Sequence, residues 1–83
     1  MQPNEIKQLI EQGLDGAQAY VSGDGSHFDA VVVGEMFRDK SLLQKQRLVN
    51  ATVNDRITSG ELHALSIKCY TPEEWAQAGK PGA

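Results

Sequence analysis

The fold of this chain is decided by the stretch ELHALSIKCYTPEEW, residues 61–75. Residues 62–70 are typical of a β-strand, and a histidine, His63, stands near the start of that strand. The residues that follow mark the beginning of a helix, because Thr71 suits the N-cap, a proline follows at the first helical position and Glu74 completes a capping box. The stretch therefore predicts a strand that runs directly into a well-capped helix.

Upstream of this stretch, the sequence predicts two helices and two strands. These are a helix that begins at Asn4 as its N-cap and ends near Gly13 or Gly16, strands over residues 17–21 and 27–33, and a helix over residues 41–57. The loop over residues 22–26 consists of Gly, Asp and Ser, which favours an antiparallel hairpin. Residues 34–40 are expected to be irregular, and residues 76–83 to form a frayed tail.

In the long helix, apolar side chains at helical spacing form a stripe that we expect to face the core. The stripe consists of Leu42, Val49, Val53 and Ile57, with Leu48 beside it. The resulting order, α-β-β-α-β-α, predicts an α+β fold, a two-layer sandwich in which helices pack on a three-stranded mixed sheet. The 83 residues are enough for one domain with one small core.

Connectivity places the two histidines of the chain, His27 and His63, at one edge of this sheet. A helical crossover joins the strands over residues 27–33 and 62–70, so these strands are expected to pair in parallel and to begin at the same edge. The single cysteine, Cys69, lies six residues beyond His63, roughly 20 Å along an extended strand. We therefore expect Cys69 to be a small hydrophobic strand residue rather than a partner of either histidine.

Composition and charge argue against several classes of protein. The hydrophobic content of 40% is typical of a soluble globular domain, and no apolar run approaches the roughly 20 residues of a membrane span. With one cysteine, no basic start followed by an apolar stretch and no membrane segment, the chain is expected to be cytoplasmic. The net charge of −3 argues against a surface coated for nucleic acid.

Two histidines do not make a complete metal site. A structural zinc site needs four ligands and a catalytic one usually three, and Asp24 and Asp29 do not supply a closed-site spacing. An iron–sulfur cluster usually has four cysteine ligands, although histidine replaces cysteine on one iron in some clusters. The residues thus allow one or two histidine ligands to a cluster that a partner completes. The pattern alone favours a packed or hydrogen-bonded His63 and an exposed His27.

An enzyme is not expected. A Cys–His nucleophile needs a hydrogen bond between the two groups, which the strand geometry denies to Cys69 and His63. Ser26 and Ser66 lack a nucleophile-elbow motif, and the glycines of residues 23–25 lie in a hairpin rather than in a phosphate-binding loop before a helix. The acidic residues are scattered and form no paired site.

A basic segment offers a second possible function. It consists of Arg38, Lys40, Lys45 and Arg47, with Asp39 as the opposing charge, and it spans the loop and first turns of the long helix. Helix N-termini attract phosphate, so the segment is a candidate nucleic-acid surface. It contains no aromatic residue on which a base could stack, and the pattern alone favours a solvated helix face.

Three segments of the chain resemble the BolA family. They are FRDKSLLQKQRLV over residues 37–49, ELHAL over residues 61–65 and YTPEEW over residues 70–75. The resemblance extends from the first helix to Trp75 and is greatest with a bacterial, BolA-like branch linked to acid stress. It implies an α-β-β-α-β-α fold related to the class II KH fold, which agrees with the order predicted from the pattern.

The resemblance also implies a role as an adaptor rather than an enzyme. Members of the family pair with monothiol glutaredoxins and share a bridging [2Fe-2S] cluster, whose ligands come from the glutaredoxin cysteine, glutathione and the BolA partner. The family's signature histidine matches His63, and a second ligand from the hairpin loop matches His27. No cofactor is then expected in the isolated chain. Other members are DNA-binding transcriptional regulators, which use the surface that carries the basic segment here.

The sequence departs from the family pattern within that surface. Many members have Phe-x-Gly where Phe37-Arg38-Asp39 stands, and Arg-His-Arg where Lys45-Gln46-Arg47 stands. The first departure removes a glycine, which tolerates unusual backbone angles, and the second removes a histidine that could act as an extra ligand or contact. Both departures weaken the implied DNA binding more than the implied cluster ligation.

Overall fold

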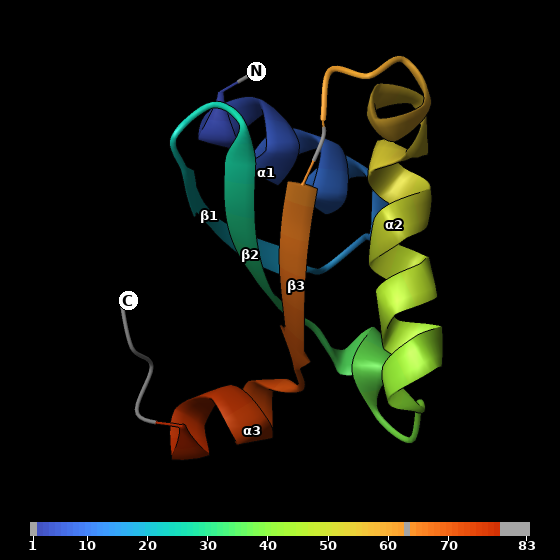
Figure 1. The fold of residues 1–83 in the computed structure, drawn as a ribbon. Coiled ribbons are helices and arrows are strands. Elements are labelled where there is room, and N and C mark those ends of the chain that lie inside the picture. The colour runs from blue at the N-terminus through green and yellow to red at the C-terminus, as the bar shows by residue number, and fades with distance from the viewer. Residues whose placement is uncertain (1, 63, 79–83) are drawn as a thin grey trace.

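The chain forms helices around a three-stranded sheet in this computed structural model, which describes residues 2–62 and 64–78 (Figure 1). In chain order, the elements are α1 (Pro3–Gly13), β1 (Gln18–Gly23), β2 (His27–Val33), the 3-10 helix η1 (Glu35–Phe37), α2 (Leu42–Thr58), β3 (Ala64–Tyr70) and α3 (Pro72–Gln77). The predicted α+β class and the order α-β-β-α-β-α are confirmed. The segment expected to be irregular contains η1, whose Phe37 is buried in the core.

The sheet has the strand order β1-β2-β3. β1 and β2 form the predicted antiparallel hairpin, with Gln18 opposite Val33. β2 and β3 pair in parallel, with His27 opposite Ala64 at one end and Val33 opposite Tyr70 at the other, as expected for strands joined by a helical crossover. This topology brings the starts of β2 and β3 to the same end of the sheet.

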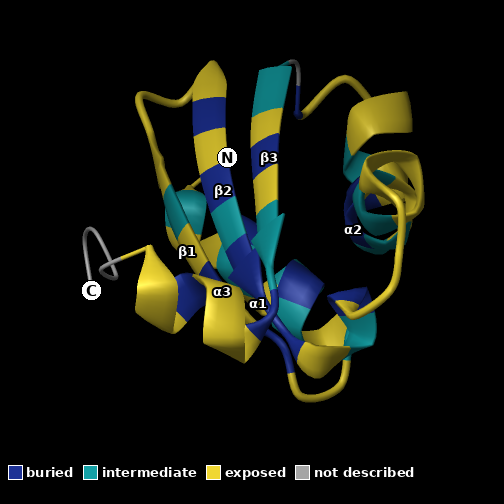
Figure 2. Ribbon diagram, turned by 90° about the horizontal axis from the view of Figure 1, so that it is seen from below, coloured by how far each residue is buried: buried dark blue, intermediate teal, exposed yellow. Residues whose placement is uncertain are grey.

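One face of the sheet carries the hydrophobic core. Side chains alternate between buried and exposed along the strands (Figure 2), because successive residues of a strand point to opposite faces. α1 and α2 cover the buried face, with Ile6 and Ile10 of α1 and Val49 and Val53 of α2 fully enclosed. The sheet contributes to the same cluster Ala19, Phe28, Ala30, Val32 and Ile67.

α3 packs on the opposite face, at one end of the sheet. Its Trp75 is buried and stacks on Tyr20 of β1, with ring centroids 5.4 Å apart, and its ring also lies 5.3 Å from that of Tyr70 of β3. Thr71 caps the helix as predicted, because its hydroxyl accepts a hydrogen bond from the Glu74 amide. The rest of this face, towards the hairpin, is hereafter the open face, and its exposed side chains include Ser22, His27, Asp29 and Ser66.

The first helix begins two residues earlier than predicted. Gln2, not Asn4, is its N-cap, and Pro3 occupies the first helical position. The main-chain N–H of Gln2 donates to the Glu5 carboxylate at 2.9 Å, which satisfies one of the free N–H groups at the start of the helix. The prediction of Asn4 as the cap was therefore wrong, since it overlooked the proline.

The predicted apolar stripe of α2 is buried only at its centre. Val49 and Val53 are enclosed, whereas Leu42 is 70% exposed and Ile57 is 42% exposed. These two residues lie in the terminal turns of α2, beyond the turns that pack on the core. The expected burial of Leu42 and Ile57 was wrong, because helical periodicity does not reveal how much of a helix lies over the sheet.

The frayed tail predicted over residues 76–83 was wrong at its start. Ala76 and Gln77 belong to α3, while residues 79–83 lie outside the part of the chain that the structure describes. Over residues 2–62 and 64–78, none of the helices combines the length and apolar character that crossing a bilayer requires.

Candidate functional site

The start of β2 places one predicted ligand at the surface. His27 is the first residue of β2, and it lies in register with Ala64, the first residue of β3. The second predicted ligand, His63, precedes Ala64 in the chain and lies outside the described residues. The predicted parallel pairing is thus present next to both histidine positions, and it brings His27 to the strand end that the sequence assigns to His63.

A hydrogen-bonded turn holds the backbone in front of His27. The carboxylate Oδ1 of Asp24 accepts hydrogen bonds from the His27 amide at 2.9 Å and the Ser26 amide at 3.0 Å. These hydrogen bonds, the one from His27 foremost, lower the pKa of Asp24 from its ordinary value. Gly23 allows the hairpin to close, because a Cβ atom there would lie 2.5 Å from both the His27 carbonyl oxygen and the Phe28 side chain.

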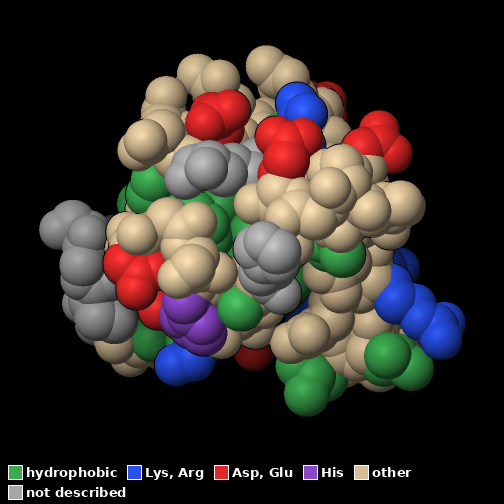
Figure 3. All heavy atoms as spheres, turned by 45° about the horizontal axis from the view of Figure 1, so that its top comes forward, with side chains coloured by type: hydrophobic (Ala, Val, Ile, Leu, Met, Phe, Trp, Pro, Cys, Tyr) green, Lys and Arg blue, Asp and Glu red, His purple; other side chains and the backbone are tan. Residues whose placement is uncertain are grey.

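The His27 imidazole is accessible from the open face. Its side chain is 56% exposed, and Nε2 lies 3.7 Å from the Asp29 carboxylate, two residues along the same face. Figure 3 shows a histidine side chain at the surface beside acidic side chains. Within residues 2–62 and 64–78, no group of three or more histidine, cysteine or acidic side chains could hold a metal ion. The exposed imidazole fits the role of one ligand in a site shared with another molecule.

Cys69 does not lie at this end of the sheet. It lies opposite Val32, five positions along β3 from Ala64, which is roughly 16 Å in a strand. It packs against the core, and burial raises the pKa of its thiol to about 11. Since metal ligation requires the thiolate, the structure agrees with the expectation that Cys69 is a small hydrophobic residue.

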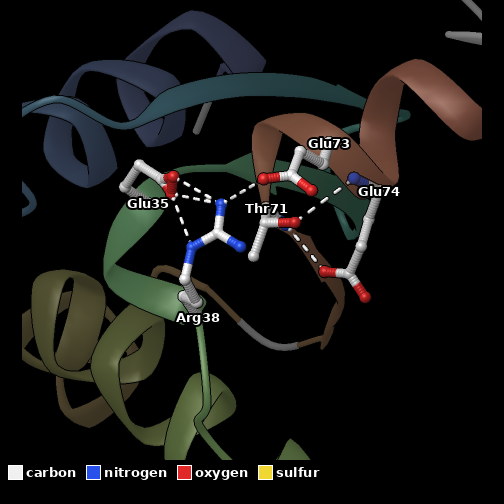
Figure 4. Close-up of polar contacts among 5 residues, drawn as sticks. All are labelled: Glu35, Arg38, Thr71, Glu73 and Glu74. Atoms are coloured by element: carbon white, nitrogen blue, oxygen red, sulfur yellow. Dashed lines mark hydrogen bonds and ion pairs between the residues drawn. The ribbon is translucent and has the colours of Figure 1, made fainter.

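Arg38 of the basic segment is held by two carboxylates. Its guanidinium contacts Glu35 at 2.6 Å and Glu73 at 2.8 Å, which ties η1 to the start of α3 (Figure 4). These contacts raise the pKa of Arg38 further above its ordinary value and, through Arg38, lower that of Glu35. Glu35 and Glu73 therefore oppose the charge of Arg38, and neither was predicted from the sequence, where Asp39 is the adjacent acidic residue. The spacing of three residues from Glu35 to Arg38 is a signal that could have identified one of them.

The other three members of the basic segment lie on α2 and the loop before it. Lys40 and Arg47 are exposed, and Lys45 is half-buried. No ion pair to these three side chains occurs among the residues that the structure describes. Glu73 and Glu74 of α3 share a shallow pocket with Lys40 and Lys45, so negative charge adjoins the positive. Nucleic-acid binding by Arg38, Lys40, Lys45 and Arg47 stays a prediction.

The two departures from the family pattern have separate structural roles. Asp39 has a φ of 62°, in the left-handed region that glycine adopts without a steric penalty. Gln46 donates from Nε2 to the carbonyl oxygen of Ile67 at 3.1 Å, so it links α2 to the outer edge of β3. The first departure keeps a glycine-like backbone with a larger residue, and the second converts the histidine position into a contact between helix and sheet.

Comparisons with known proteins agree with this fold. A family model described as BolA-like protein matches residues 8–74. The chain is 42% identical to acid stress protein IbaG of Escherichia coli over 80 residues, which cover 96% of this chain and 95% of that protein. It superposes on the structure of a bolA protein homologue from Coxiella burnetii with a TM-score of 0.84 and 39% identity, over 92% of this chain and 97% of the other. The BolA domain of SufE1 from Arabidopsis thaliana gives a TM-score of 0.74 and 32% identity, with 87% and 93% covered.

Proposed function

Since the chain belongs to the BolA-like family, we propose that it is a non-enzymatic adaptor that pairs with a monothiol glutaredoxin and shares a [2Fe-2S] cluster with it. His27 and His63 are the proposed ligands from this chain, and the glutaredoxin cysteine and glutathione supply the others. The adaptor acts in the cytoplasm, in iron–sulfur trafficking, iron sensing or a stress response. The proposal is carried by one observation, the exposed His27 imidazole in register with the residue that follows His63.

The chemistry of the available groups supports a shared site. Imidazole nitrogen can replace thiolate on one iron of a [2Fe-2S] cluster, and two histidines leave the other iron to ligands from elsewhere. The hydrogen bond from the His27 N–H to Asp24 holds the main chain at His27, and this fixes the position of the Cα atom that carries the imidazole. When bound, the cluster would supply one-electron chemistry or be passed on as cargo. This chain would bind it at the open face.

The proposal is tested by purifying the chain together with a monothiol glutaredoxin and glutathione under anaerobic conditions. Iron and sulfide are then measured, with visible absorption and circular dichroism of the complex. His63→Ala should abolish the cluster spectrum, and His27→Ala should alter it while some complex persists. Ser66→Ala, which changes an exposed residue of β3, is the control and should leave the spectrum as it is. An unchanged spectrum in both histidine variants would contradict the assignment of His27 and His63 as ligands.

A further inference from the structure

At each outer edge of the sheet, side chains of a helix form hydrogen bonds with main-chain groups of the strand, and the number of these bonds differs between the two edges. At β3, Gln46 of α2 bonds the outward carbonyl of Ile67. At β1, both main-chain groups of Ala19 are bonded by α1, since the Ala19 amide donates to Glu11 at 2.9 Å and Lys7 donates to the Ala19 carbonyl at 3.1 Å. An unpaired strand edge invites pairing with another chain, so such contacts block it locally.

The α1 contacts at Ala19 form an ion pair as well as a block. Lys7 and Glu11 are one helical turn apart, and their charged groups are 2.5 Å from each other. The hydrogen bond from Lys7, followed by that from the Ala19 amide, lowers the pKa of Glu11. Both acceptor and donor of Ala19 are therefore satisfied within the molecule, and this position is closed to a second chain.

The edge is open beyond Ala19. In an antiparallel pair, main-chain groups point alternately towards the partner strand and away from it. Ala19 points away from β2, so Val21 and Gly23 do as well, and the inward hydrogen bond from the Asp24 amide to the His27 carbonyl fits this alternation. Among the described residues, no side chain bonds the main chain of Val21 or Gly23, in contrast to Ala19.

A groove lies along this open part of the edge. It has a volume of about 550 Å³ and continues from α1 over β1 onto the open face. Its lining residues are Lys7, Ala19, Tyr20, Val21, Ser22, Asp29 and Val31. Tyr20 and Val31 are neighbours across the hairpin and give an apolar floor, while the small Ser22 leaves the 64% exposed Asp29 carboxylate accessible beside it.

We propose that β1, at Val21–Gly23, binds an extended segment of a partner protein by strand addition. Main-chain hydrogen bonds to Val21 and Gly23 would supply affinity, and alternate side chains of the added strand would lie over the open face. One apolar side chain packs on Tyr20 and Val31, and a Lys or Arg two positions away reaches Asp29. The contacts at Ala19 set the register, because the added strand cannot pair beyond them.

Charge complementarity selects a basic partner segment over a second copy of this chain. Asp29 faces the groove, and Asp24 carries its negative charge at the adjoining turn. Two copies paired through β1 would offer these carboxylates no cation from the added strand, because β1 contains no Lys or Arg. A partner segment with a cation at that position meets them with opposite charge. This proposal goes beyond the adaptor function and does not depend on the cluster.

The test uses the full chain labelled with ¹⁵N and a short synthetic peptide in which valine alternates with threonine and one valine is replaced by arginine, so that the arginine and the remaining valines lie on one face of the added strand. Titration should shift the amide signals of Val21 and Gly23 and slow their hydrogen exchange, while the Ala19 amide is unaffected. A peptide with glutamate in place of arginine should bind more weakly. Asp29→Asn should weaken the arginine peptide about 2- to 5-fold, the range of an exposed ion pair, whereas Asp55→Asn, an equal charge change on α2, should not.

A second variant tests the role of the α1 contacts independently. Glu11→Ala removes the acceptor of the Ala19 amide, so the added strand should extend to Ala19, shift its signal and bind more tightly. The proposal is overturned if the β1 amides do not respond to the arginine peptide. It is equally overturned if Asp29→Asn and Asp55→Asn weaken binding alike. Failure here would leave the cluster spectra with glutaredoxin unchanged, so the two proposals fail separately.

Discussion

The left-handed backbone of Asp39 leads us to predict a difference in stability between two substitutions at this position. Asp39→Gly and Asp39→Ala remove the same carboxylate, but only alanine keeps a Cβ atom at a φ of 62°. A Cβ in this region costs about 1–2 kcal/mol, whereas alanine gains roughly 0.4–1 kcal/mol over glycine by restricting the unfolded chain. The difference leaves Asp39→Gly more stable than Asp39→Ala by about 0.5–1 kcal/mol.

This difference is measurable by unfolding in urea followed by far-ultraviolet circular dichroism, and by calorimetry. For a domain of this size, it corresponds to a difference of about 2–8 °C in Tm. Asp55, exposed in α2, provides the matched control, because its backbone is helical. There the order should reverse, with Asp55→Ala more stable than Asp55→Gly by about 0.5–1 kcal/mol. If Asp39→Ala equals or exceeds Asp39→Gly in stability, the left-handed conformation of Asp39 is refuted.

Three further predictions follow from single contacts. Ser41→Ala should lower the free energy of unfolding by about 1 kcal/mol in urea, because the Ser41 hydroxyl accepts from the Gln44 amide at the start of α2. Glu11 has a lowered pKa when folded, so its stabilisation is present above the ordinary value of 4.5 and is lost as the pH falls through the folded value; wild type should lose more stability than Glu11→Gln in urea titrations over this acid range. Cys69, with a pKa of about 11 against 9.0, should react about 100-fold more slowly with a thiol-specific reagent at pH 8 in the folded than in the unfolded chain, and equal rates would contradict its burial.

The sequence predicted those features that short segments determine. The cap at Thr71 and the following proline signalled α3, and the Gly- and Asp-rich loop signalled the hairpin. Parallel pairing of β2 and β3 followed from connectivity alone, since a long crossover returns the chain in the same direction. These inferences place His27 at the end of the sheet where β2 and β3 begin, without any knowledge of packing.

Features that depend on distant contacts could not be predicted in this way. The bond between Arg38 and Glu73 joins residues 35 positions apart, and no local pattern marks it. Closure of the β1 edge at Ala19 depends on how α1 lies across the sheet. The exposure of Leu42 likewise depends on where α2 stops covering the core, which its periodicity does not show.

The aromatic contact between α3 and the sheet has a spectroscopic consequence. Trp75 is the single tryptophan of the chain, and it is stacked on Tyr20 and close to Tyr70, away from the cluster enclosed by α1 and α2. Its fluorescence, including energy transfer from these tyrosines, therefore reports the docking of α3, while circular dichroism reports mainly the larger helices. A fluorescence change without a change in circular dichroism would identify local release of α3, and coincident transitions would identify one cooperative unit.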